Sequence, residues 1–98
     1  MGDFLEAVVL LLPSDAGGRA RPIAPREGTF RPLVGSMQTR FIEGPPTIEP
    51  GHGGRVVVEL EDTPDDDVVA GSELQIIEND RVVGLLTVMR VWRKALAV

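Results

Sequence analysis

The stretch RVVVELE, residues Arg55–Glu61, has the most regular alternation of side-chain type in the chain. Val56, Val58 and Leu60 would lie on one side of a strand, because successive side chains of a strand point to opposite faces. Charged residues occupy most of the remaining positions. The stretch therefore predicts a half-buried β-strand, with one face on a core and the other in water.

Two segments that precede this stretch also predict strands. Phe4–Leu12 is mostly apolar, contains the β-branched Val8 and Val9 and ends at Pro13, which favours a strand over a helix. Ser36–Ile42 alternates in the same way as the first stretch. The residues that we expect on one face of this second strand are Met37, Thr39 and Phe41.

The C-terminal part of the chain predicts a β-hairpin. The segments Glu73–Glu78 and Val82–Trp92 are rich in Val, Ile and Leu, and Asn79-Asp80 stands between them. Asn and Asp tolerate the positive φ angles of a two-residue hairpin turn, which would place Glu78 opposite Arg81. In the second of these segments, Gly84 marks a point where a barrel strand can bend.

We count six strand-like segments, although the patterns give ranges for only five. Gly and Pro make up 19 of 98 residues, more than is usual, and they gather in turns such as the stretch Pro13–Pro32, where Ile23 and Phe30 are the expected core anchors. The sequence therefore predicts an all-β fold, a six-stranded closed antiparallel β-barrel. We expect a single domain over residues 1–98, with the barrel at about 3–92 and a tail at 93–98.

The residue inventory argues against catalysis. The chain has no cysteine, a single histidine at His52 and no phosphate-binding loop motif, so thiol, His-pair and P-loop chemistry lack their residues. The acidic run Asp62–Asp67 lacks the spacing of a calcium loop and is expected to be solvated. We therefore expect no enzyme, no cofactor, no bound nucleotide and no metal. The short apolar run near the N-terminus fits neither a secretory signal nor a membrane span, and we expect a cytoplasmic protein with no membrane partner.

Five motifs in order carry a family resemblance. Gly17-Gly18-Arg19-Ala20-Arg21-Pro22 is followed by Phe30-Arg31-Pro32 and then by a strand that ends at Gly44. Pro50-Gly51 comes next, before Val56-Val57-Val58-Glu59-Leu60, and Ile76-Ile77-Glu78-Asn79-Asp80-Arg81-Val82-Val83-Gly84 is the last. This order resembles the C-terminal barrel, the third domain, of translation elongation factor Tu, over about residues 3 to 92.

The resemblance implies a six-stranded barrel and a role in translation. In that family the barrel helps to hold the T-stem side of aminoacyl-tRNA and touches the exchange factor, so tRNA or a translation-factor protein is the expected partner. We therefore expect a non-catalytic binding module. The candidate RNA-binding residues are Arg19, Arg21, Arg31, Thr39 and Arg40.

A second interpretation keeps the barrel without RNA binding. The net charge of −5 opposes binding to phosphates, and Gln38 and Glu43 stand where the resemblance leads us to expect a more cationic strand. In this interpretation the protein is an interaction or oligomerisation barrel, and a homo-oligomer is one such assembly. The loop arginines would then pair with Glu27, Asp15 or carbonyls of their own turn, and Phe4 and Trp92 would pack in the core or at an end of the barrel.

Overall fold

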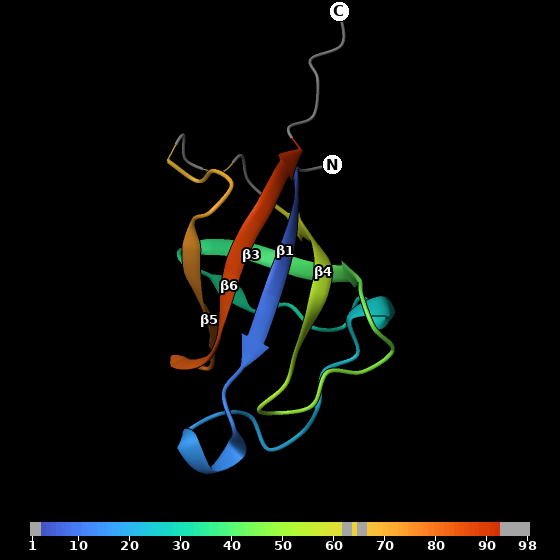
Figure 1. Cartoon of the computed structure of the whole chain (residues 1–98), viewed down its shortest axis with the longest axis vertical. Coiled ribbons are helices and arrows are strands. Elements are labelled where there is room, and N and C mark those ends of the chain that lie inside the picture. Colours follow the sequence, from blue (N-terminus) through green and yellow to red (C-terminus); the bar gives the residue numbers. More distant parts are fainter. Residues whose placement is uncertain (1–2, 62–63, 65–66, 93–98) are drawn as a thin grey trace, which may run out of the picture.

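A computed structural model of the chain describes residues 3–61, 64 and 67–92. Its six antiparallel strands close into a ring in the order β1-β4-β3-β2-β5-β6, so the predicted all-β class and the closed antiparallel arrangement are confirmed. The strands are β1 (Phe4–Leu11), β2 (Leu33–Val34), β3 (Met37–Glu43), β4 (Gly53–Leu60), β5 (Glu73–Glu78) and β6 (Arg81–Trp92). Figure 1 shows β6, β1 and β4 side by side, with β3 crossing behind them. The expected tail at 93–98 lies outside the described residues.

The core lies inside the ring and is built from alternate strand residues. Leu5, Ala7, Val9 and Leu11 of β1 are fully buried, while the residues between them are partly or well exposed. The predicted inward faces of β4 and β3 are confirmed. In β4 the buried residues are Val56, Val58 and Leu60. In β3, Thr39 and Phe41 are buried and Met37 is partly buried beside them. A strand with one apolar face is stable here because closure of the ring buries that face and leaves no long sheet edge.

The structure supplies the missing strand and shifts the bounds of every predicted strand except Glu73–Glu78 by one or two residues. β1 ends at Leu11 rather than Leu12, β4 ends at Leu60 rather than Glu61, and β6 begins at Arg81 rather than Val82. The sixth strand, for which no range was predicted, is β2, and it has only two residues. β4 begins at Gly53 rather than at Arg55, because Gly53 and Gly54 pair with Leu10 and Val9 of β1. β3 is shifted by one residue and includes Glu43.

The predicted β5–β6 hairpin is confirmed in its turn and its register. Asn79 and Asp80 have φ angles of 53° and 62°, as a type I′ turn requires, and Glu78 pairs with Arg81 across it. Beyond the turn the register of the hairpin shifts by one residue. Ile77 pairs with Val82 but Ile76 pairs with Gly84, as at a β-bulge in β6.

Gly84 lies at a close approach of β6 to β1. A Cβ atom at this position would stand 2.7 Å from the carbonyl oxygen of Leu10, which is closer than carbon and oxygen tolerate. Glycine is therefore required at this approach of the two backbones, while the bend of the strand predicted at Gly84 stays a prediction.

The turn-rich stretch contains two short 3₁₀ turns, η1 (Ser14–Ala16) and η2 (Pro25–Glu27). Its two predicted anchors are confirmed: Ile23 forms a β-bridge with Ile48, and Phe30 packs edge-on against Phe41 with ring centroids 5.0 Å apart. These anchors fix the stretch against the end of the ring. No helix within the described ranges is both long and apolar enough to cross a membrane.

Candidate functional site

The arginine hollow is an open depression of about 340 Å³ beside the β5–β6 hairpin. Three arginines and one glutamate among its lining residues leave two net positive charges, against −5 for the whole chain. Its lining residues are Arg19, Ala20, Arg21, Glu78, Asn79, Arg81 and Val83. The hollow is thus a local cationic site on an acidic protein.

Arg19 links the glycine-rich turn to the hairpin. Its Nε donates to Oε1 of Glu78 at 2.8 Å, and its Nη1 donates to the carbonyl of Pro22 at 3.1 Å and to that of Arg21 at 3.3 Å. The guanidinium carbon also lies 4.9 Å from the ring centre of Phe30, within the range of a cation–π contact. Part of this cation is therefore committed to holding the fold.

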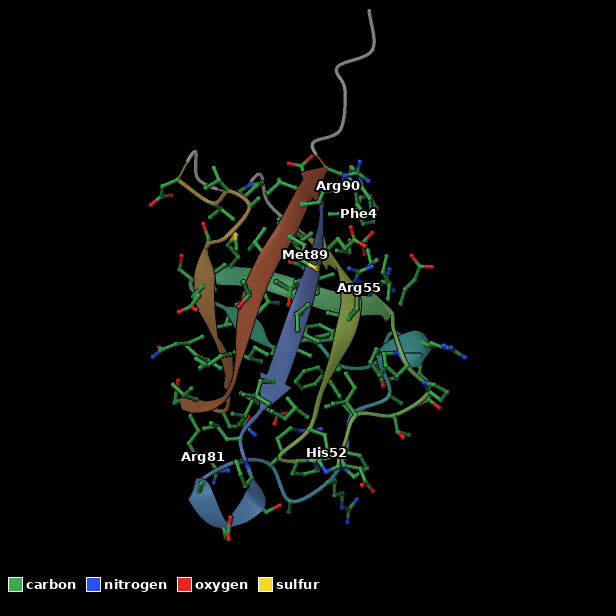
Figure 2. The ribbon with its side chains drawn as sticks, viewed as in Figure 1. Phe4, His52, Arg55, Arg81, Met89 and Arg90 are labelled. Atoms are coloured by element: carbon green, nitrogen blue, oxygen red, sulfur yellow. The ribbon has the colours of Figure 1, made fainter. Side chains whose placement is uncertain are left out.

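Arg81 makes the reciprocal link from the hairpin to the turn. Its Nη2 donates to the carbonyl of Gly18 at 3.0 Å, as Arg19 reaches from the turn to Glu78. Figure 2 shows Arg81 beside the η1 turn. Two arginines from segments about sixty residues apart thus hold the walls of the hollow in place.

Arg21 is exposed, like Arg81, and differs from the other two arginines of the hollow in its hydrogen bonding. Among the described residues its guanidinium forms no hydrogen bond and no ion pair, while its carbonyl accepts from Arg19. A guanidinium offers five N–H donors in a planar fork that matches a phosphate. Arg21 is therefore the residue with the most donors left for a ligand.

Arg31 lines a second, larger depression of about 560 Å³, which shares Arg19 and Glu78 with the arginine hollow. Here Glu27, Glu78 and Asp80 outnumber the two arginines, so the charge of the lining is negative. The structure places Arg31 near the hollow but in an acidic setting.

Thr39 and Arg40 lie apart from the hollow. The Thr39 side chain is buried, and its hydroxyl donates to the carbonyl of Pro32 at 2.8 Å, so its polar atom faces the protein. Arg40 pairs with its cross-strand neighbour Glu59, with Nη2 2.8 Å from the carboxylate. Of the five candidate residues, the structure thus brings only Arg19 and Arg21 into one cationic site.

The interpretation of the arginines as paired side chains fits Arg19 in part. It donates to carbonyls of its own turn, as that interpretation expects, but its acidic partner is Glu78 rather than Glu27 or Asp15. Sequence reasoning missed Arg81 as a site residue, because it used this position only as the first residue after the hairpin turn. The proximity of the hairpin to the Gly17-Gly18 turn arises from closure of the ring.

The prediction that the chain binds no metal concerns its histidine, aspartate and glutamate side chains. Within residues 3–61, 64 and 67–92, no three His, Asp or Glu side chains come together in a metal-binding arrangement. Most of the acidic run Asp62–Asp67 lies outside the described residues.

The chain was also compared with known proteins. Neither a scan against protein-family models nor a search of curated proteins finds a match. The likeness to the third domain of elongation factor Tu therefore rests on the sequence motifs alone.

Proposed function

We propose that this protein is a non-catalytic binding module, related to the third-domain barrel of elongation factor Tu, which holds an RNA phosphate in the arginine hollow. The observation that carries the proposal is that Arg19, Arg21 and Arg81 line one hollow whose described lining contains a single carboxylate, that of Glu78. The Gly17–Pro22 turn that supplies two of these arginines is also the first motif of the resemblance. Aminoacyl-tRNA in the cytoplasm is accordingly the proposed ligand.

The geometry favours an anion for a physical reason. Arg19 and Arg81 are held in place by their bonds to Glu78 and to Gly18, so little side-chain entropy remains to be lost when a ligand binds. Arg21 supplies an unpaired guanidinium next to them. A phosphate in the hollow would accept charge-assisted hydrogen bonds from preorganised donors.

The test is binding of aminoacyl-tRNA by fluorescence anisotropy at micromolar protein, at about 50 and 200 mM salt. Neutralising one phosphate releases its counterions, so the affinity should fall by roughly threefold over this range for each phosphate that the hollow holds. Arg21→Ala should weaken binding by roughly five- to tenfold and reduce the salt dependence, because one phosphate contact is lost.

The matched control is Arg55→Ala. Arg55 is also an exposed arginine, with a side chain 63% exposed, and it lies on β4 outside the hollow. This variant should bind RNA nearly as well as the original chain. Absence of salt-sensitive binding, or equal losses in the two variants, would refute the RNA proposal.

A second candidate function is a protein-interaction or oligomerisation barrel that binds no RNA. One observation favours it: among the residues that the structure describes, seven large hydrophobic side chains are exposed, and five of them belong to β1 and β6. Mixing the protein with elongation factor Tu or its exchange factor, and measuring its own mass in solution, tests this function. A monomer that forms neither complex would contradict it.

A further inference from the structure

The outward side chains of β1 and β6 form an apolar stripe, which we call the β1–β6 face. The exposed fractions of its aliphatic and sulfur-containing members lie between 39% and 51%. Trp92, expected to pack in the core or at an end of the barrel, is the last residue of β6 and pairs with Phe4 at the end of the ring; its 38% exposure places it outside the core and on this face. The members of the face are Phe4, Glu6, Val8 and Leu10 from β1, and Leu85, Thr87, Met89, Arg90 and Trp92 from β6.

A β-bulge adds to this face. Glu6 pairs with Arg90 and Ala7 with Val88, so Met89 is the extra residue of β6. Both Met89 and Arg90 are exposed, whereas strict alternation would bury one of them. Figure 2 shows Met89 on the side of the molecule that β6, β1 and β4 present, with Arg90 near one end of it.

The register of the two strands gives this face a distinctive order. Across the β1–β6 seam an aromatic residue pairs with an aromatic one, an acid with a base, and a leucine with a leucine. The outward pairs are Phe4 with Trp92, Glu6 with Arg90, Val8 with Thr87, and Leu10 with Leu85. Three of the four outward residues of β1 are thus matched by a β6 residue of like or complementary chemistry, and the fourth, Val8, pairs with the β-branched Thr87.

We propose that a second copy of this chain packs on the β1–β6 face, related by a two-fold axis that runs parallel to the strands between β1 and β6. Such an axis places β1 of one copy over β6 of the other and keeps each residue at the same position along the strands. Each pair within the chain is therefore repeated between copies: Glu6 meets the second copy's arginine at position 90, and Leu10 meets its leucine at position 85. An isologous contact of this kind is self-complementary.

The charges select this axis over the alternative. A two-fold axis in the plane of the face but at right angles to the strands would place β1 on β1 and β6 on β6. Glu6 could then face only Phe4, Glu6, Val8 or Leu10 of the other copy, none of which is basic. Arg90 would likewise find no acid on β6. In that arrangement Glu6 would keep only Arg55 of its own chain, at 3.9 Å, and Arg90 only the Trp92 ring, 5.3 Å from its guanidinium carbon, so neither charge would gain an oppositely charged partner from the other copy.

The contact is narrow, and this sets its expected strength. Two strands of about eight residues cover a strip roughly 10 Å wide and 27 Å long on each copy. Interfaces of this size are smaller than those of stable complexes, so we expect a weak dimer that depends on concentration. Measurements should therefore extend from micromolar to millimolar protein.

The experiment is sedimentation of the whole chain and of two charge-reversal variants, Glu6→Arg and Arg90→Glu. The original chain should approach twice its 10.6 kDa as its concentration rises. Each variant alone should associate at least tenfold more weakly, because like charges then meet across the axis. An equal mixture of the two variants should associate again, because two arginines on one copy face two glutamates on the other.

Mixing separates an effect on the interface from an effect on folding. Each variant has two like charges at positions 6 and 90 of its own chain, and mixing does not change that pair. Association that returns on mixing therefore reports on contacts between copies. A second, uncharged comparison is Leu10→Ser with Leu33→Ser. Both leucines are exposed, at 51% and 39%, but Leu33 lies on β2, away from this face. Only Leu10→Ser should reduce association.

A chain that remains monomeric up to millimolar concentration would overturn the proposal, as would variants that fail to associate when mixed. The inference does not rest on RNA binding. Arg21→Ala should leave association unchanged, and Leu10→Ser should leave RNA binding unchanged, so failure of one proposal is distinguishable from failure of the other.

Discussion

At the scale of single residues, Arg19 shows how one side chain serves both the fold and the candidate site. Its side chain is only 21% exposed and contacts Glu78, two carbonyls and Phe30. These contacts connect the Gly17–Pro22 turn to β5, which the chain reaches about sixty residues later. The arginine is therefore a structural tie as well as a wall of the arginine hollow.

We predict that Arg19→Ala lowers the free energy of unfolding by about 1–3 kcal/mol, because Glu78 and two turn carbonyls lose a partly buried charged donor. Arg21→Ala should change it by less than about 0.5 kcal/mol, because that side chain is exposed. Urea denaturation followed by circular dichroism measures both values. Equal stabilities of the two variants would contradict the structural role of Arg19.

At the scale of elements, the β5–β6 hairpin follows from local sequence. Asn79 and Asp80 adopt positive φ angles that few residues other than glycine tolerate, and apolar residues flank the polar centre on both sides. The turn thus sets the register that pairs Glu78 with Arg81. This local agreement explains why the hairpin was predicted correctly.

The same turn gives a prediction about stability. Asp80→Gly should raise the free energy of unfolding by up to about 1 kcal/mol, because Asn-Gly is preferred in type I′ turns and glycine adopts a φ of 62° without strain. Thermal melting measures the change. Asp80→Ala serves as the comparison and should lower stability, since alanine also lacks the carboxylate but keeps a Cβ. A lower melting temperature for the glycine variant would disprove the turn assignment.

Other elements had no local signal. β2 consists of Leu33 and Val34 only, too short for any periodicity to be visible. The bulge at Met89 cannot be read from the sequence either, because it depends on how β6 pairs with β1. These features arise from the pairing of strands that are distant in the chain.

At the scale of the whole molecule, the strand pairings around the ring differ in length. β1 pairs along almost its entire length with both β4 and β6, whereas β2 contributes two residues to each of its pairings with β3 and β5. A backbone bond from Gly35 to the Gln75 carbonyl at 2.8 Å extends the β2–β5 seam slightly. The ring is therefore expected to open first at β2.

Native-state hydrogen exchange tests this expectation. The amide of Gly35 should exchange at least tenfold faster than amides at the centre of β1, such as those of Ala7 and Val9, because opening of a short seam requires less free energy than global unfolding. Equal protection at the two places would mean that the ring opens only as a whole.

The sequence by itself determined the strand class, the inward faces of β3 and β4 and the hairpin turn, because side-chain alternation and backbone φ preferences are local properties. The tertiary structure decided which arginines share a hollow, since Arg19 and Arg81 meet only when the ring closes. It also decided that the Thr39 hydroxyl donates to the Pro32 carbonyl and that β1 and β6 present a common apolar face. Contacts between distant segments depend on how the strands pair around the ring, and no single segment encodes that order.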